Sequence, residues 1–236
     1  TYEEGADAAL SHVSFRAYPG ETIGIIGGTG SGKSSLVSLI PHFYDVKDGR
    51  VSVFGKNVCA YDDEDLRHRI GYVQQKAVLF QGTVRSNLLW GDDSASDDDL
   101  RTALSTAQVL DIVADKGGLD APVEQNGANF SGGQKQRLSV ARALVRKPQI
   151  LVLDDSSSAL DYATEAAMRK AILALPYKPT LFIVSQRASS VMCADRILVL
   201  EDGRLVGDGT HKALLANCPA YCEIYHSQFS EEVTDA

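Results

Sequence analysis

A single glycine-rich octapeptide constrains the fold of this chain more than any other feature of its sequence. Residues 27–34 read Gly-Gly-Thr-Gly-Ser-Gly-Lys-Ser and fit the pattern G-x-x-x-x-G-K-[ST]. The short apolar run Thr22–Ile26 precedes the octapeptide and is typical of a buried strand. The segment Ser34–Ile40 follows and is expected to form a helix that Pro41 stops. A strand, a glycine loop and a helix in this order predict an α/β domain.

The residue types of this loop suit the binding of ATP together with Mg²⁺. Glycines let backbone N–H groups approach phosphate oxygens closely, and a helix N-terminus adds partial positive charge. Lys33 is expected to reach the β- and γ-phosphates, and the Ser34 hydroxyl is expected to ligate Mg²⁺. The expected ATP contacts in this segment are Gly28, Thr29, Gly30, Ser31, Gly32, Lys33, Ser34 and Ser35. The alternative is a plain glycine turn with a surface lysine, which the flanking strand and helix disfavour.

A second apolar run ends in two carboxylates. Ile150–Leu153 is typical of a buried strand, and Asp154 follows it directly, at the edge of a parallel sheet where ligands bind. A phosphate loop needs such a carboxylate for Mg²⁺, so Asp154 is the expected metal ligand. Asp155 is then the candidate general base for the attacking water. The alternatives are a cap or turn role for Asp154 and a helix N-cap role for Asp155.

Strand and helix patterns alternate along the chain, which predicts a parallel sheet with crossover helices. The stretch from about residue 83 to 147 is richer in helix formers and helix-start signals, and we interpret it as an inserted α-helical subdomain. Besides the runs above, the expected elements are strands at Leu10–Phe15, Arg50–Phe54, Leu181–Val184 and Ile197–Leu200, and a helix at about Tyr162–Leu175.

Composition and charge exclude several other classes of protein. The chain has 236 residues, 44% of them hydrophobic and 23% charged, so a full core is expected. Its net charge of −8 argues against a nucleic-acid-binding domain, and no apolar stretch reaches the length of about 18 residues that spans a bilayer. The cysteines form no CxxC pair, so zinc is not expected. A disulfide is not expected either, because the rest of the sequence is typical of a cytosolic protein. The chain begins at Thr1 rather than Met, and we expect it to be part of a longer protein.

The segment Phe130–Arg137 reads Phe-Ser-Gly-Gly-Gln-Lys-Gln-Arg and resembles the LSGGQ signature of the ATP-binding cassette (ABC) family, with Phe130 in the leucine position. On Ser-Gly-Gly-Gln alone we would expect only a helix start, since serine is a good N-cap. The order of the motifs also resembles the family: phosphate loop, glutamine loop, signature, metal aspartate, then Ser158–Asp161. The resemblance runs from Tyr2 to at least Phe229. It implies a single ABC ATPase domain, 1–236, with a P-loop NTPase core, a parallel sheet, an antiparallel β subdomain and the helical subdomain.

The resemblance implies roles for further residues. Two cassettes of this family pack head to tail, and each ATP lies between the phosphate loop of one and the signature of the other. Tyr2 then stacks on adenine, although it could also be a plain apolar anchor, and Asp161 lies at the dimer contact. Gln75 contacts Mg²⁺, with Gln74 as the adjacent rival. The residues that would cap the partner's γ-phosphate are Ser131, Gly132, Gly133 and Gln134.

Three segments are similar to the exporter branch of the family: Val78–Asn87, Gly207–His211 and Tyr221–Phe229. In that branch membrane helices precede the cassette on the same chain. The implied partners are transmembrane domains and a second cassette, without nucleic acid. The implied location is the cytoplasmic face of the cell membrane.

The chain departs from the family pattern at the chemical groups of its own site. The family has glutamate where Asp155 stands and histidine where Gln186 stands. The segment Ala121–Gly127 matches the family's usual pattern before the signature less closely. The signature that the chain lends to a partner is intact apart from Phe130. This asymmetry predicts the slow half of a heterodimeric exporter. The alternatives are a self-sufficient homodimeric ATPase and a non-transport, regulatory ATP-binding cassette. A cassette that acts on DNA or ribosomes is disfavoured because there is no heptad run and the charge is negative.

Overall fold

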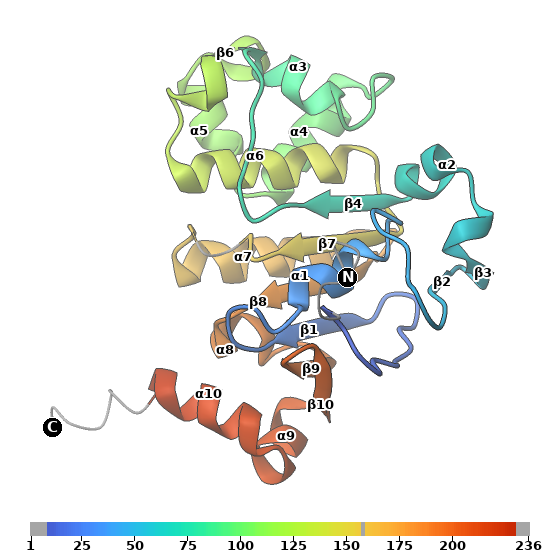
Figure 1. Ribbon diagram of the computed structural model, residues 1–236. Coiled ribbons are helices and arrows are strands. Elements are labelled where there is room, and N and C mark those ends of the chain that lie inside the picture. The colour runs from blue at the N-terminus through green and yellow to red at the C-terminus, as the bar shows by residue number, and fades with distance from the viewer. Residues whose placement is uncertain (1–8, 157–158, 230–236) are drawn as a thin grey trace, which may run out of the picture. The chain divides into compact units, whose positions relative to one another are not determined.

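The chain folds into two units, each with its own strands and helices (Figure 1). The computed structural model describes residues 9–156 and 159–229. Unit 1 consists of Thr1–Leu66 and Thr180–Ala236, and unit 2 of Arg67–Pro179. The α/β fold class predicted from the sequence is confirmed.

A mostly parallel sheet forms the centre of unit 1, and β1, β8 and β9 in it are apolar runs of the kind expected for buried parallel strands. Its strand order is β10-β9-β1-β8, with β1 parallel to both neighbours and β10 antiparallel to β9. Every residue of β1 and β8 is buried, which is the usual condition of a central parallel strand. The strands are β1 (Thr22–Ile26), β8 (Thr180–Ser185), β9 (Arg196–Glu201) and β10 (Arg204–Gly209).

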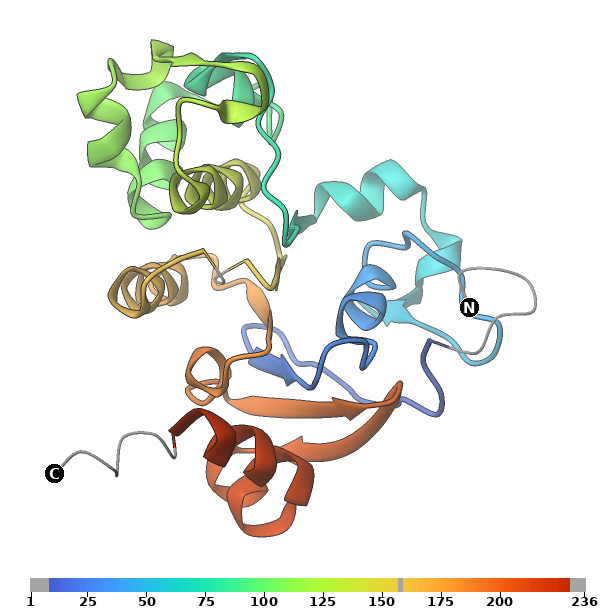
Figure 2. The same cartoon turned by 60° about the vertical axis from the view of Figure 1, so that its left-hand side comes forward.

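The helices of unit 1 follow its strands along the chain. They are α1 (Lys33–Ser38), α8 (Ala188–Val191), α9 (His211–Asn217) and α10 (Pro219–Phe229). Figure 2 shows α9 and α10 side by side next to β10. Tyr221 of α10 is fully buried, and its hydroxyl lies 2.8 Å from Nδ1 of His211. This contact joins the last two helices to each other.

A short hairpin completes unit 1. Strand β2 (Ser52–Val53) pairs antiparallel with β3 (Lys56–Asn57). Phe54 and Gly55 form the turn with φ of 51° and 78°, and positive φ at both positions is what a two-residue hairpin turn requires. The 3-10 helix η1 (Val58–Ala60) and helix α2 (Asp63–His68) follow, and the chain passes into unit 2 within α2.

Unit 2 contains a parallel strand pair and the helices α3 to α7. Strand β4 (Ile70–Val73) pairs with β7 (Ile150–Asp154), Ile70 opposite Ile150. Helix α6 (Gly132–Val145) packs against β4, α3 and α4. The other elements are β5 (Gly82–Thr83), α3 (Val84–Leu89), α4 (Asp97–Thr106), α5 (Leu110–Asp115), η2 (Gly118–Asp120), β6 (Pro122–Val123), η3 (Gln125–Gly127) and α7 (Tyr162–Leu173). Helices α3 to α6 thus lie within the stretch 83–147, and the inserted-subdomain interpretation of this stretch stays a prediction.

One expected strand is wrong and three elements are shorter than expected. The helix expected at about Tyr162–Leu175 ends at Leu173. Residues 10–15 form no strand, although their exposure alternates, because the left-handed φ of 56° at His12 interrupts the extended backbone. The strand expected at Arg50–Phe54 contracts to β2, since the hairpin turn begins at Phe54. Helix α1 ends at Ser38, two residues before the expected Ile40, because the backbone after it forms bonds to the third preceding residue.

Candidate functional site

The phosphate loop joins β1 to α1 within unit 1. Its last glycine, Gly32, is the N-cap of α1 and has a φ of 93°, a left-handed conformation that suits glycine. A Cβ at Gly27 would lie 2.1 Å from the carbonyl oxygen of Leu200, at the end of the neighbouring strand β9. The loop therefore follows the sheet edge at a distance that only glycine allows at position 27.

Lys33 folds over this loop. The side chain is only 8% exposed, and Nζ donates to the carbonyl oxygens of Gly27 at 2.8 Å and Gly28 at 2.6 Å. It also lies 3.3 Å from Oγ of Ser31. The ammonium is thus held within the glycine loop, and a cation at the start of a helix that follows such a loop is a suitable site for a phosphate chain. Beside it on the first turn of α1, Ser34 is exposed and Ser35 is half-buried.

The loop also contacts the segment after β8. The Thr29 hydroxyl donates to Oε1 of Gln186 at 3.4 Å. Gln228 of α10 holds the backbone here: its Nε2 donates to the Gln186 carbonyl and its Oε1 accepts from the N–H of Ala188, both at 2.8 Å. Sequence reasoning missed Gln228, because it lies 42 residues from Gln186 and belongs to no motif.

The expected metal carboxylate is the last residue of β7 in unit 2. Asp154 is 6% exposed, and the hydroxyl of Tyr72 donates to its Oδ2 at 2.9 Å. Tyr72 on β4 lies opposite Val152, two residues before Asp154, so both side chains are on the same face of the strand pair. Sequence reasoning missed Tyr72, because only the pairing of β4 with β7 brings it to Asp154.

Asp155 and Gln75 lie together in the same unit. Nε2 of Gln75 donates to Oδ2 of Asp155 at 2.9 Å, and Asp155 has a left-handed φ of 45°. The rival glutamine, Gln74, is bound through its backbone, because the buried side chain of Gln136 donates to its carbonyl at 3.1 Å. The geometry therefore orients Gln75 toward the candidate base and fixes the backbone just before it.

The signature begins α6 as a capping box. Ser131 is the N-cap: its side chain accepts from the N–H of Gln134 at 3.3 Å, and Gln134 Oε1 accepts from the N–H of Ser131 at 3.0 Å. The glycines between them, Gly132 and Gly133, form the first turn of the helix. Phe130 is 4% exposed and fills a core position, so a phenylalanine in the leucine position of the motif leaves the following turn intact.

Asp161 is the N-cap of α7. Its carboxylate accepts from the N–H of Thr164 at 2.9 Å and from the Thr164 hydroxyl at 2.7 Å, and these hydrogen bonds lower the pKa of Asp161. Two residues of the sequence prediction, Tyr2 and Ser158, lie outside the described residues. The structure thus brings together Thr29 with Gln186 and Gln75 with Asp155, and the relation of the phosphate loop to Asp154 stays a prediction.

Comparison with known proteins gives consistent matches. The sequence model of the family described as "ABC transporter" matches residues 10–158. The uncharacterized ABC transporter ATP-binding protein YfiB of Bacillus subtilis is 47% identical over 236 residues, which are 100% of this chain and 41% of that protein. The ATP-dependent lipid A-core flippase of Haemophilus ducreyi is 39% identical over 233 residues, 98% of this chain and 40% of the flippase.

A solved structure agrees with these matches. The structure of a bacterial Atm1-family ABC exporter with ATP bound superimposes with a TM-score of 0.90 at 35% identity, covering 94% of this chain and 39% of the exporter chain. The chain therefore spans about two-fifths of the length of the relatives it matches. Among the described residues, no helix has the length and apolar character needed to cross a membrane.

Proposed function

The chain belongs to the ABC transporter family, and from this premise we propose that it is the Mg-ATP-binding domain of an exporter. In this proposal, ATP binding and hydrolysis by the chain drive substrate export through transmembrane domains, with the chain at the cytoplasmic face of the membrane. The similarity to a lipid A-core flippase and to an Atm1-family exporter supports the export direction.

The observation that carries the proposal is the position of Lys33 over the glycine loop, with Nζ 2.6 and 2.8 Å from two loop carbonyls. In the proposal this ammonium binds the β- and γ-phosphates. Mg²⁺ prefers hard oxygen ligands, and the hydroxyl of Ser34, the carboxylate of Asp154 and the amide oxygen of Gln75 match that preference. Because Nε2 of Gln75 donates to Asp155, its Oε1 is the end suited to the metal.

Hydrolysis at the chain's own site is slow in this proposal. Asp155 is one methylene shorter than glutamate, and geometric errors of about 1 Å can lower a rate about 10²-fold. Gln186 can donate a hydrogen bond but cannot carry charge or transfer a proton. Loss of a positioned proton-transfer group typically costs about 10²–10⁴-fold. The main role of Asp155, Gln75 and Gln186 is then to retain nucleotide rather than to cleave it.

The signature is proposed to complete the site of a second, different cassette. The capping box uses the N–H groups of Ser131 and Gln134, so Gly132 and Gly133 between them supply the amides for the partner's γ-phosphate. Asp161 is proposed to lie at the dimer contact. In the resulting pair, the site at this chain's own phosphate loop is slow, and the partner's site is completed by this chain's signature.

Binding of a fluorescent ATP analogue with Mg²⁺ tests the first part of the proposal. Lys33→Ala should weaken binding by at least tenfold, whereas Lys47→Ala, which removes an exposed lysine of the same unit, should leave it unchanged. Equal affinities of the two variants would contradict the assigned role of Lys33.

Light scattering with and without Mg-ATP tests the choice of partner. A chain that stays monomeric with ATP supports a different partner cassette, and ATP-dependent self-association supports the homodimer instead. A mixed hydrolysis assay tests the remaining alternative, with this chain added to a cassette that has the family's glutamate and histidine. If the chain binds ATP but does not stimulate hydrolysis by that cassette, the regulatory cassette is favoured.

A further inference from the structure

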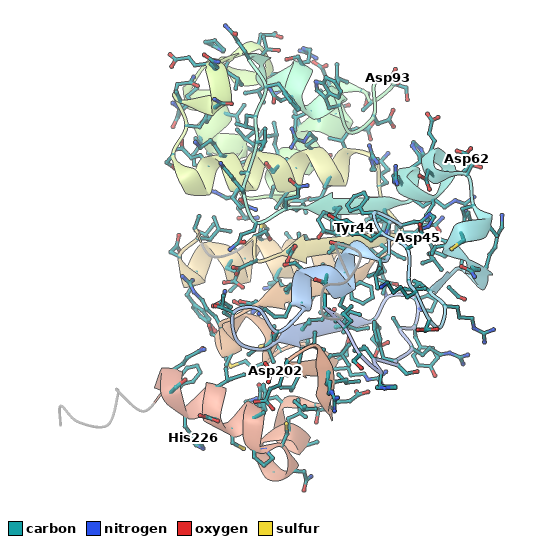
Figure 3. The ribbon with its side chains drawn as sticks, in the orientation of Figure 1. Tyr44, Asp45, Asp62, Asp93, Asp202 and His226 are labelled. Carbon is teal, nitrogen blue, oxygen red and sulfur yellow. The ribbon has the colours of Figure 1, made fainter. Side chains whose placement is uncertain are left out.

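Four side chains that commonly bind metals lie close together in unit 1, in a region that the proposed function does not use. His42 follows α1, Asp45 lies three residues later, Cys59 belongs to η1, and Asp63 begins α2. The ligand atoms of His42, Asp45 and Cys59 lie within 4.8 Å of one another. Figure 3 labels Asp45 on the loop that follows α1.

The two ring nitrogens of His42 point to different partners. Nε2 lies 2.9 Å from Oδ1 of Asp45, and the Sγ of Cys59 lies 3.9 Å from the same oxygen. On the other side of the ring, Nδ1 lies 3.1 Å from Oδ1 of Asp63. A metal-binding histidine typically donates its second N–H to a carboxylate in this way, which fixes the ring and makes the ligating nitrogen more basic.

The backbone and the exposure of these residues also suit a ligand site. His42 adopts a left-handed φ of 54°, and its side chain is only 18% exposed, so the ring is held in one orientation. Asp45 is 82% exposed and Cys59 is exposed, so an ion can reach them from solvent. The N–H of Cys59 is bound at 3.1 Å by the side chain of Asn57, which fixes the start of η1.

We propose that His42, Asp45 and Cys59 bind a zinc ion, with Asp63 as the carboxylate that orients the histidine. Zinc accepts a mixed set of thiolate, imidazole and carboxylate ligands in tetrahedral geometry, whereas Mg²⁺ and Ca²⁺ prefer oxygen alone. Three protein ligands leave the fourth position to a water molecule. From the absence of a CxxC pair, the sequence predicts no zinc site. That pattern detects only ligands that lie together in one segment, whereas here His42 and Asp45 come from the loop after α1 and Cys59 comes from η1.

The metal would connect the loop after α1 to η1. The β2–β3 hairpin lies between these two segments in the chain, so the metal would restrain the chain on both sides of the hairpin. Metal bound to the folded chain stabilises it by mass action, so the melting temperature should rise with zinc concentration. This effect needs no nucleotide, and it therefore separates the zinc site from the proposed ATP site.

Chelator-treated chain, without nucleotide, is titrated with Zn²⁺ in competition with a chromophoric chelator. We expect one Zn²⁺ per chain, and Cys59→Ser should lower the affinity at least about tenfold. Cys193→Ser removes another exposed cysteine of the same unit and should change nothing. His42→Asn, which retains a residue type that tolerates left-handed φ, should abolish the binding. Asp63→Asn should weaken zinc binding by about 10–100-fold, the usual effect of losing the carboxylate that orients a metal-binding histidine.

Cobalt substitution provides a second readout. Co²⁺ in place of Zn²⁺ should show a thiolate-to-cobalt charge-transfer band that is lost in Cys59→Ser and retained in Cys193→Ser. Unchanged melting temperatures of the variants without metal show that they are folded. The proposal is overturned if the wild-type chain binds no zinc, or if Cys59→Ser and Cys193→Ser bind it equally; the cluster is then a set of surface ion pairs only.

Discussion

Alanine in place of Gly27 is expected to displace the phosphate loop. The new Cβ would lie 2.1 Å from the backbone oxygen of Leu200 and 2.6 Å from Oγ of Ser31, whereas Cβ atoms essentially never come within 3.0 Å of such atoms. Since the nearest atom belongs to the backbone of β9, no side chain can turn away to relieve the clash. Overpacking of this kind costs about 1–3 kcal/mol of unfolding free energy. A loop shift of about 1 Å can in addition lower a catalytic rate about 10²-fold.

Gly28→Ala is the matched control, because a Cβ there would meet nothing within 4 Å. Its unfolding free energy should stay within about 0.5 kcal/mol of the wild-type value. Urea unfolding followed by circular dichroism measures both variants, and a fluorescent ATP analogue measures their nucleotide affinity. Equal stability and equal affinity of the two variants would refute the close approach of the loop to β9.

Three further substitutions test separate contacts. Gln228→Leu removes the hydrogen bonds that hold the backbone after β8, so it should lower the unfolding free energy by about 1 kcal/mol per bond and weaken binding of the fluorescent ATP analogue; unchanged values of both would contradict this role. Phe130→Leu should cost less than about 1.5 kcal/mol in urea unfolding and leave ATP hydrolysis by a mixed pair unchanged, whereas Phe130→Ala should cost about 3–5 kcal/mol. Asp161→Ala should lower the melting temperature near neutral pH by more than Asp161→Asn does, because asparagine retains the cap. Since the pKa of Asp161 is lowered from 3.8 in the folded chain, its contribution is full above 3.8 and is lost as the pH falls through the lowered pKa, so the wild-type advantage over Asp161→Asn should disappear in acid thermal unfolding.

Buried parallel strands are the part of the fold that the sequence predicts best. The bounds of β1 coincide with the apolar run Thr22–Ile26, and β7 and β8 each extend the expected run by one or two residues. Such strands are buried on both faces, so an unbroken apolar run indicates them without reference to the rest of the molecule. Strand β4 has no such run, because Gly71 interrupts it. A Cβ at Gly71 would lie 3.2 Å from the backbone of α6, and the sequence around Gly71 gives no sign of this close packing.

The candidate site likewise contains residues that the sequence predicts and residues that it does not. Residues within motifs, such as Lys33 and Asp154, can be predicted because loop chemistry and strand ends are local properties of the sequence. Gln228 and Tyr72 cannot be found as motif members, because each contributes through one side chain that tertiary folding brings to a distant segment. The same limit applies to the His42 cluster, whose members come from a loop, a 3-10 helix and a helix start.

The central claim, that the chain's own site lacks chemical groups rather than structure, is tested most directly by steady-state Mg-ATP hydrolysis. The wild-type chain is compared with the double variant Asp155→Glu/Gln186→His, and Lys33→Ala sets the background. We predict a wild-type rate near background and a gain of at least about tenfold in the double variant, which corresponds to about 1.4 kcal/mol of transition-state stabilisation. A wild-type chain that already hydrolyses ATP briskly, with no gain from the double change, would contradict the claim and support a self-sufficient homodimeric ATPase.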